Sequence, residues 1–100
     1  MYARHVTVSG DPANADEAIR RLEEVVMPVL RASAGFQGQA VLLDRASGTA
    51  IGISFWDTEE NMHASEERVG AARQQVAASL GAGAAPEVRL YEVPIFETNA

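Results

Sequence analysis

The sequence predicts an α+β domain of the ferredoxin-like type, in which two helices cover one face of a four-stranded antiparallel sheet in the order β-α-β-β-α-β. Three observations predict it. Four short segments alternate apolar and polar residues, two longer segments repeat apolar residues at helical spacing, and glycine or proline separates them. One hundred residues with 47% hydrophobic content suit a single domain, expected over residues 1–100.

The first part of the chain is typical of a strand followed by a helix. Alternation around Val6 and Val8 predicts a strand over Tyr2–Ser9. A helix is expected over residues 13–32, where the apolar positions at helical spacing are Ile19, Leu22, Val25, Val26, Val29 and Leu30. Pro28 falls inside this pattern, so we expect a kink there or the start of the last turn.

The rest of the chain is typical of a hairpin, a helix and a last strand. The hairpin strands are expected over Phe36–Asp44 and Thr49–Trp56, joined by a short loop. Thr58 suits the N-cap of a second helix, and two acidic residues follow it. Val88–Phe96 completes the sheet, and Pro94 indicates that its end lies at an edge or beyond the ladder.

Charge and composition exclude several classes of function. A net charge of −6 argues against binding to nucleic acid or to an anionic membrane surface. All 8 basic residues are arginine, which excludes lysine Schiff-base chemistry, and the lack of cysteine excludes thiolate catalysis and thiolate metal sites. No apolar run approaches the length of a membrane span, and the N-terminal residues are too few and too polar for a signal peptide. We therefore expect a cytoplasmic protein.

The strand expected over Thr49–Trp56 has one bulky face and one nearly bare face. Its bulky apolar residues are Ile51, Ile53 and Phe55. The small residues between them are Ala50, Gly52 and Ser54, and Trp56 closes that face. A strand without large side chains on one face indicates that a helix, a partner subunit or a ligand approaches its backbone closely.

Three further motifs stand out. The first helix ends at Ala34-Gly35-Phe36, the strand that runs to Trp56 is followed by an acidic helix start and His63, and the terminal strand reads Tyr91-Glu92-Val93-Pro94-Ile95-Phe96. Together these features resemble the antibiotic biosynthesis monooxygenase superfamily. The resemblance covers the order of elements over the whole chain. It implies a homodimeric α/β barrel and, as in the cofactor-free oxygenases of the family, conversion of phenolic polyketides to quinones. We therefore expect no cofactor.

A homodimer is also expected from the sheet itself, because the helices cover only one of its faces. We expect the opposite face to carry Val41, Leu43, Trp56 and Tyr91. These side chains are too apolar to leave in water. The pattern favours sheet-to-sheet pairing of two copies over a monomer with one solvated face.

Three residues are candidates for catalysis. The resemblance places Trp56 where a tryptophan lines the substrate pocket of the family's oxygenases, although such a ring more commonly packs in a core or a dimer seam. His5 and His63 are suited to moving a proton near neutral pH. A histidine among acids on a helix is, however, typical of an ion-paired surface residue. Glu59 and His63 lack a third ligand nearby, so no metal site is expected.

Substrate-binding residues are expected around the small face of the third strand. If Val6 and Val8 pack under the helices, His5 and Thr7 point to the opposite face, beside Gly52, Ser54 and Trp56. The residues expected to contact a substrate are Thr7, Gln39, Gly52, Ser54, Phe55 and Tyr91. The family's oxygenases carry an asparagine where this chain has Gly52, which removes a polar partner of Trp56 and leaves room for a ring. A hydrated dimer interface is the alternative for this lining.

With the resemblance, the sequence favours a small-molecule enzyme of secondary metabolism, a cofactor-independent protein of the monooxygenase type that holds an aromatic or polyketide-type substrate between sheet and helices. Two alternatives stay open. The same pocket suits a proton-transfer cyclase of the polyketide type, and the apolar face suits a non-catalytic dimeric binding module. Haem degradation is disfavoured, because the first strand has His5 and Thr7 where haem-degrading relatives have an asparagine.

Overall fold

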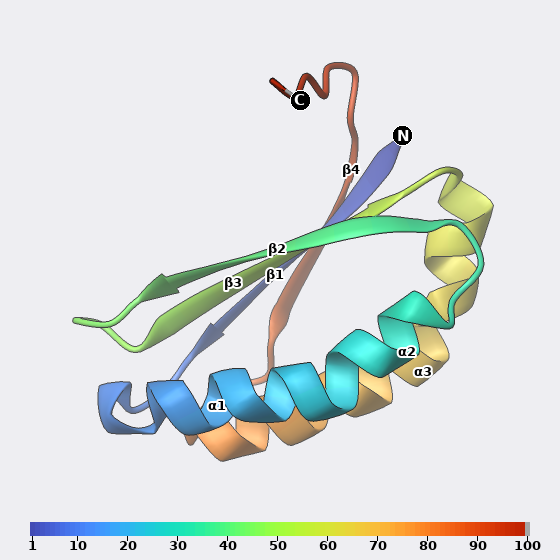
Figure 1. The fold of residues 1–100 in the computed structure, drawn as a ribbon. Coiled ribbons are helices and arrows are strands. Elements are labelled where there is room, and N and C mark those ends of the chain that lie inside the picture. The colour runs from blue at the N-terminus through green and yellow to red at the C-terminus, as the bar shows by residue number, and fades with distance from the viewer. Residues whose placement is uncertain (100) are drawn as a thin grey trace.

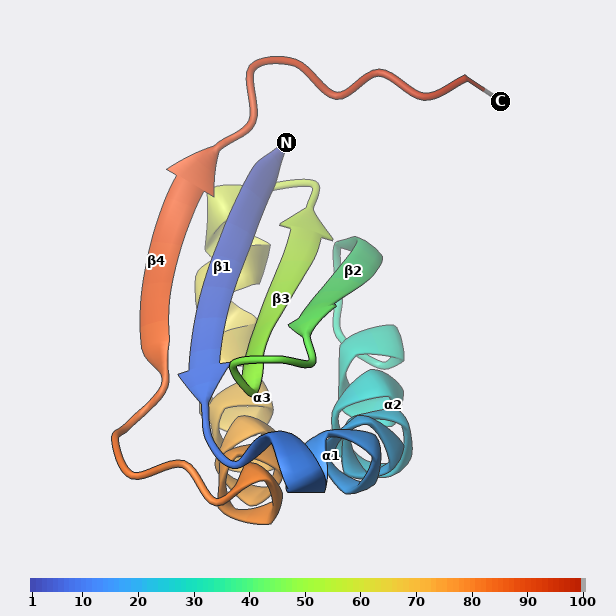
Figure 2. The same ribbon diagram turned by 90° about the vertical axis from the view of Figure 1, so that its left-hand side faces the viewer.

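The computed structural model describes residues 1–99 and contains one antiparallel sheet of four strands. The strands are β1 (Tyr2–Ser9), β2 (Phe36–Asp44), β3 (Thr49–Trp56) and β4 (Glu87–Glu92). Their order in the sheet is β2-β3-β1-β4, so the first strand lies in the middle and the hairpin partner β2 forms one edge (Figure 2). This is the ferredoxin-like arrangement that the sequence predicts.

The helical segments form a single layer on one face of the sheet (Figure 1). They are η1 (Pro12–Asn14), α1 (Ala15–Arg21), η2 (Leu22–Val26), α2 (Met27–Arg31) and α3 (Glu59–Leu80). In the described part of the chain, residues 1–99, the other face of the sheet carries no helix. No helix within residues 1–99 is both long enough and apolar enough to cross a bilayer.

The helix predicted over residues 13–32 is interrupted by the π-helical segment η2. The N–H of Met27 donates to the carbonyl of Leu22, five residues earlier. Pro28 has no N–H, and its ring would collide with the carbonyl four residues before it in a regular α-helix. The wider turn avoids that collision, so the kink expected at Pro28 takes the form of a π-bulge. Two of the five residues in this bulge, Leu22 and Val26, line the cavity described below.

The remaining bounds follow the prediction with one exception. Thr58 caps α3, since its Oγ1 accepts a hydrogen bond from the N–H of Asn61 at 3.1 Å. The last strand is shorter than predicted and ends at Glu92. The N–H of Val93 still donates to the carbonyl of Met1 at 2.9 Å, and Pro94 then stops the ladder because it has no N–H to donate.

The register of β1 against β3 decides which residues the helices cover. Arg4 lies opposite Ser54, Val6 opposite Gly52 and Tyr2 opposite Trp56. Opposite residues in an antiparallel pair point to the same side of the sheet. Since Val8, Ser54 and Trp56 are all buried, this is the face beneath the helices. The small residues of β3 therefore face inward.

Two predictions about the faces of the sheet are wrong for this reason. His5 and Thr7 lie opposite Ile53 and Ile51, on the uncovered face, and not beside Gly52, Ser54 and Trp56. Val41 and Leu43 lie opposite Gly52 and Ala50, so together with Trp56 they belong to the covered face and not to the open one. The physical cause is that the bulky side chains that alternate along β3 point away from the helices, whereas its small residues point toward them.

The prediction for Tyr91 is confirmed, because Tyr91 lies opposite Ala3 on the uncovered face. Its ring is 51% exposed there and meets the ring of His5 edge-on, with centroids 6.3 Å apart. Phe96 extends the same surface by packing on Phe55 with centroids 5.0 Å apart. The open face is thus apolar, as expected, but through a different set of side chains.

Candidate functional site

A cavity of about 70 Å³ lies between the helices and the small-residue face of the sheet. The small residues of β3 create it. On the face beneath the helices this strand carries Ala50, Gly52 and Ser54, and all three line the cavity. A Cβ placed on Gly52 would meet a single atom within 4 Å, Nε2 of Gln39 at 3.4 Å. The backbone at Gly52 would therefore accommodate a residue with a side chain. The absence of a side chain at this position leaves space in the cavity.

A wider hollow of about 580 Å³ opens outside this cavity, between the edge strand β2 and the first helix. The cavity and the hollow share the lining residues Ile19, Leu22, Gln39 and Val41, so the hollow forms the entrance. Its outer rim carries the charged residues Glu23 and Arg31. Sites for small molecules have volumes of about 300–1,000 Å³. The hollow is within that range, whereas the cavity alone admits only a small group.

Arg4 is the most unusual residue of the cavity, because it is charged and only 2% exposed. It points under the helices from the middle of β1. Its Nη2 donates to the carbonyl of Met62 and to Oγ of Ser65, the latter at 2.9 Å. Its guanidinium carbon lies 5.3 Å from the ring centroid of Trp56, a cation–π contact. These contacts tie β1 to the first two turns of α3.

Glu66 lies between two arginines that line the cavity. One of its oxygens is 2.9 Å from Nε of Arg4, although that N–H is not directed at it. Arg73 binds the same carboxylate with both terminal nitrogens, at 2.7 and 3.1 Å. Such a forked contact is the strongest form of an arginine–carboxylate pair. The group formed by Arg4, Glu66 and Arg73 therefore contains two positive charges and one negative charge.

The pKa values in this group shift in the directions that its geometry predicts. Partial burial raises the pKa of Glu66, but the hydrogen bonds and charge of Arg73 and the charge of Arg4 outweigh burial, so that the pKa falls below its ordinary value. Burial lowers the pKa of Arg4, and the charge of Glu66 opposes that change. Arginine nevertheless stays protonated in proteins, so the cavity keeps its excess positive charge.

Three of the six residues expected to bind substrate line the cavity, and three do not. Gly52, Ser54 and Gln39 line it. Thr7 pairs with Ile51 and Glu87, and Ala3 pairs with both Phe55 and Tyr91. Thr7, Phe55 and Tyr91 therefore lie on the uncovered face. The sheet itself separates the two sets.

The structure does not bring the three expected catalytic residues together. Trp56 is fully buried in the core, against Phe36, and its Nε1 donates to Oγ of Ser54 at 2.9 Å. His5 lies on the uncovered face of the sheet. His63 is 56% exposed on α3, with its Nε2 at 3.4 Å from an oxygen of Glu59. None of the three lines the cavity.

Sequence reasoning did not identify Arg4, Glu66 or Arg73 as residues of a site. A signal for Arg4 was present, because it has the same parity as Val6 and Val8 and so shares the apolar face of its strand. A charged residue on such a face is rarely buried without a partner. Arg73 could have been found from its spacing, since it is one turn from Val69 and Val76, both of which line the cavity.

The lining of the cavity holds few acid–base groups. Among the described residues, no histidine and no carboxylate lines it, although Glu66 contacts two of its arginines. Within the same part of the chain, no group of three or more His, Cys, Asp or Glu side chains is placed to hold a metal ion.

Comparison with solved structures identifies the fold. Over 97% of this chain and 92% of the other, it superimposes with a TM-score of 0.76 and 16% identity on a monooxygenase from the ActVA-Orf6 gene of Streptomyces coelicolor, solved in complex with nanaomycin D. It superimposes similarly on a candidate antibiotic biosynthesis monooxygenase of Deinococcus radiodurans, with a TM-score of 0.75 and 19% identity over 100% and 99% of the two chains. The chain has the fold of the antibiotic biosynthesis monooxygenases.

Sequence comparison adds a relative without an assigned activity. The uncharacterized protein Rv2557 of Mycobacterium tuberculosis is 39% identical over 93 residues, which are 93% of this chain. The chain spans about two fifths of the length of that relative, 41%. No protein-family model matches the chain. The chain therefore shares its fold with known monooxygenases, and its sequence relative carries no assigned reaction.

Proposed function

We propose that this monooxygenase-fold protein is a small-molecule enzyme that oxidises an aromatic or polyketide-type substrate without a cofactor. The observation that carries the proposal is the apolar cavity beside Gly52, which opens into a hollow large enough for a ring system. The Streptomyces coelicolor protein of the same fold has been solved with an aromatic ligand, nanaomycin D. That complex supports the choice of substrate class.

The proposed substrate is a phenol whose ring lies in the hollow and whose oxygen-bearing end enters the cavity. In such a reaction the phenolate supplies the electrons that reduce dioxygen. A ring C–H becomes a second carbonyl with one atom of dioxygen, and the other oxygen atom leaves as water with the ring hydrogen and the hydroxyl hydrogen. Atoms and electrons then balance without a further reductant. The protein contributes a shaped, largely dry cavity and stabilisation of the phenolate charge.

A cavity-filling substitution tests this proposal. We expect the protein to consume oxygen and form a quinone from a two-ring or three-ring phenol, such as 1-naphthol or 9-anthrol, with no cofactor added. Gly52→Val should abolish turnover, because its methyl groups occupy the cavity. Gly83→Val is the matched control, since a Cβ at Gly83 meets no atom within 4 Å and lies outside the sheet. Absence of turnover in the unmodified protein, or equal turnover in the two variants, would count against the enzyme.

A homodimer is part of the proposal. The uncovered face exposes apolar side chains that are costly to leave in water, among them Leu42 at 48%, Tyr91 at 51% and Phe96 at 53%. We propose that this face packs on the same face of a second copy. Sedimentation should then give about 21 kDa, twice the chain mass of 10.7 kDa. Leu42→Glu should shift the mass to that of one chain, whereas an exposed change on α3, such as Glu67→Gln, should not.

A non-catalytic binding protein is the second candidate, and one observation favours it. Within residues 1–99 no histidine or carboxylate lines the cavity, so a reaction that needs a protein base has none there. This observation also weighs against the proton-transfer cyclase. A binding module would retain an aromatic ligand in the hollow and show no oxygen uptake. Titration with 1-naphthol, measured together with oxygen consumption, separates binding from turnover.

A further inference from the structure

Two buried nitrogens of the Arg4 guanidinium, Nε and Nη1, form no hydrogen bond within residues 1–99. Nε nevertheless lies 2.9 Å from an oxygen of Glu66, so Nη1 is the donor left for a ligand. The rest of the side chain is held by Met62, Ser65 and Glu66. A buried donor without a partner loses its hydrogen bonds to water and gains none in return, and the cost is greater when the group is charged. Arg4 also lines the cavity. A ligand in the cavity is therefore the natural acceptor for Nη1.

The charge around the cavity points in the same direction. Arg4 and Arg73 both line it, and among residues 1–99 Glu66 is the carboxylate that pairs with them. Glu66 is 44% exposed, so solvent screens its charge more than that of Arg4, whose side chain is 2% exposed. An apolar cavity with an excess positive charge favours a ligand that brings a negative charge, because the low local dielectric strengthens the attraction.

We propose that the cavity binds its ligand as an anion, with an ionised oxygen on an aromatic ring accepting a hydrogen bond from Nη1 of Arg4. The inference rests on the proposed function and specifies its substrate class: a phenol that loses its proton to solvent on binding, or an aromatic carboxylate. In either case Arg4 fixes the orientation of the ring, because the charged oxygen enters the cavity and the ring stays in the hollow. For a phenol, the O–H bond breaks and its proton goes to water; for a carboxylate that is already ionised, no covalent bond changes.

Paired probes of nearly equal shape test the inference. 4-Nitrophenol is compared with 4-nitroanisole, and 4-nitrobenzoate with its methyl ester, by equilibrium titration of the full chain. We expect at least one anion to bind about tenfold or more tightly than its neutral partner, since a hydrogen bond to a charged group is worth about 1.5–3 kcal/mol. The pair that shows the difference identifies the oxygen as phenolate or carboxylate. For 4-nitrophenol, the visible absorbance of the ionised form should also rise on binding at constant pH.

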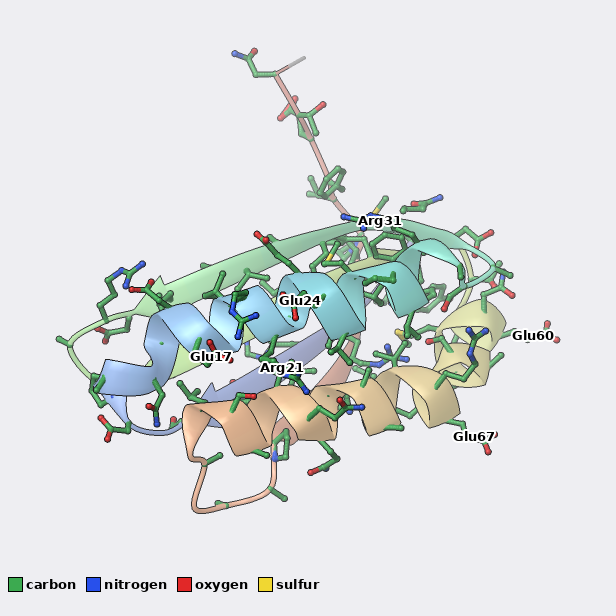
Figure 3. All side chains as sticks on the ribbon, turned by 60° about the horizontal axis from the view of Figure 1, so that its bottom comes forward. Glu17, Arg21, Glu24, Arg31, Glu60 and Glu67 are labelled. Atoms are coloured by element: carbon green, nitrogen blue, oxygen red, sulfur yellow. The ribbon has the colours of Figure 1, made fainter. Side chains whose placement is uncertain are left out.

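Removing a neighbouring negative charge provides the deciding variant. Glu66→Gln keeps an oxygen that can accept from Arg73 but raises the net charge beside the cavity, so the anion should bind about threefold or more tightly and the neutral probe unchanged. Glu67→Gln is the matched control, because it changes the same charge one residue away on the exposed side of α3 (Figure 3). A purely structural Glu66 would not improve anion binding. Arg4→Met, if its circular dichroism shows a folded chain, should lose the preference for the anion.

The outcomes separate this inference from the proposed function. If charged and neutral probes bind equally and Gly52→Val abolishes both, the cavity binds aromatic molecules but the role of Arg4 is refuted. If no probe binds, or if binding survives Gly52→Val, both the inference and the proposed site are refuted. Equal affinities of the anion for Glu66→Gln and Glu67→Gln would also refute the inference.

Discussion

Gly35 joins the first helix to β2, and its replacement by alanine should destabilise the chain strongly. Gly35 has a φ of +79°, a conformation that costs a residue with a side chain about 1–2 kcal/mol. An added Cβ would lie within 3.0 Å of three atoms of α3 and its cap: Oδ1 of Asp57, and Nδ2 and Cβ of Asn61. The substitution therefore acts on the backbone of one element and on the start of another.

The magnitude follows from the bonds that must move. The new methyl displaces the Asp57 carboxylate, which accepts from the N–H of Thr58 at 2.6 Å and from Nδ2 of Asn61 at 2.9 Å. Hydrogen bonds of this kind contribute about 0.5–1.5 kcal/mol each. Together with the backbone cost, Gly35→Ala should lower the free energy of unfolding by about 2–5 kcal/mol. For a domain of this size, that corresponds to a fall in Tm of at least about 8 °C.

Urea denaturation followed by circular dichroism measures this loss. Gly38→Ala is the matched control, because Gly38 lies only three residues away, has no positive φ, and a Cβ there meets no atom within 4 Å. We expect the control to change the free energy of unfolding by less than about 1 kcal/mol. Equal stability of the two variants would refute the assignment of Gly35 as the point where the first helix, β2 and α3 lock together.

Three further predictions concern the buried tryptophan, the charge group and the histidines. Trp56 is fully buried, so its emission should be blue-shifted and resist iodide quenching in the ligand-free protein; ready quenching would contradict its place in the core. The pKa of Glu66 is lowered in the folded chain, so its contribution to stability is present above the ordinary value of 4.5 and is lost as pH falls through the lower folded value. Glu66→Gln should therefore lose less stability than the unmodified chain between pH 5 and acid denaturation, as measured by urea titration at several pH values. His5→Ala and His63→Ala should leave any turnover unchanged, because neither histidine lines the cavity; a large loss would instead assign a proton-transfer role to one of them.

Local signals were strong enough to predict most elements before any contact was known. Alternation predicted β1, β2 and β3 with their observed bounds, and Thr58 with the acids behind it predicted the start of α3. These features depend on neighbours in the chain, through backbone geometry and capping. The π-bulge before Pro28 could be predicted only in part. The proline predicts that the helix is interrupted, but which turn widens depends on what the helix packs against.

The group formed by Arg4, Glu66 and Arg73 could not be predicted from neighbouring residues in the sequence. Arg4 and Ser65 are 61 positions apart, and Arg4 and Glu66 meet only because β1 packs beneath α3. Helical spacing brings Glu66 close to Arg73 but does not reveal that both turn toward Arg4. The excess charge beside the cavity is thus a property of the packing of sheet on helix.

The sequence by itself determined the order of the elements, the bounds of three strands, the bare stretch around Gly52 and the apolar character of both faces of the sheet. Only the tertiary structure decided which face the helices cover. Alternation separates the side chains of a strand into two sets but does not say which set turns inward, and the register of β1 against β3 settles that for every residue at once. That choice placed Arg4 and Gly52 around a cavity and left His5 and Tyr91 on the open face.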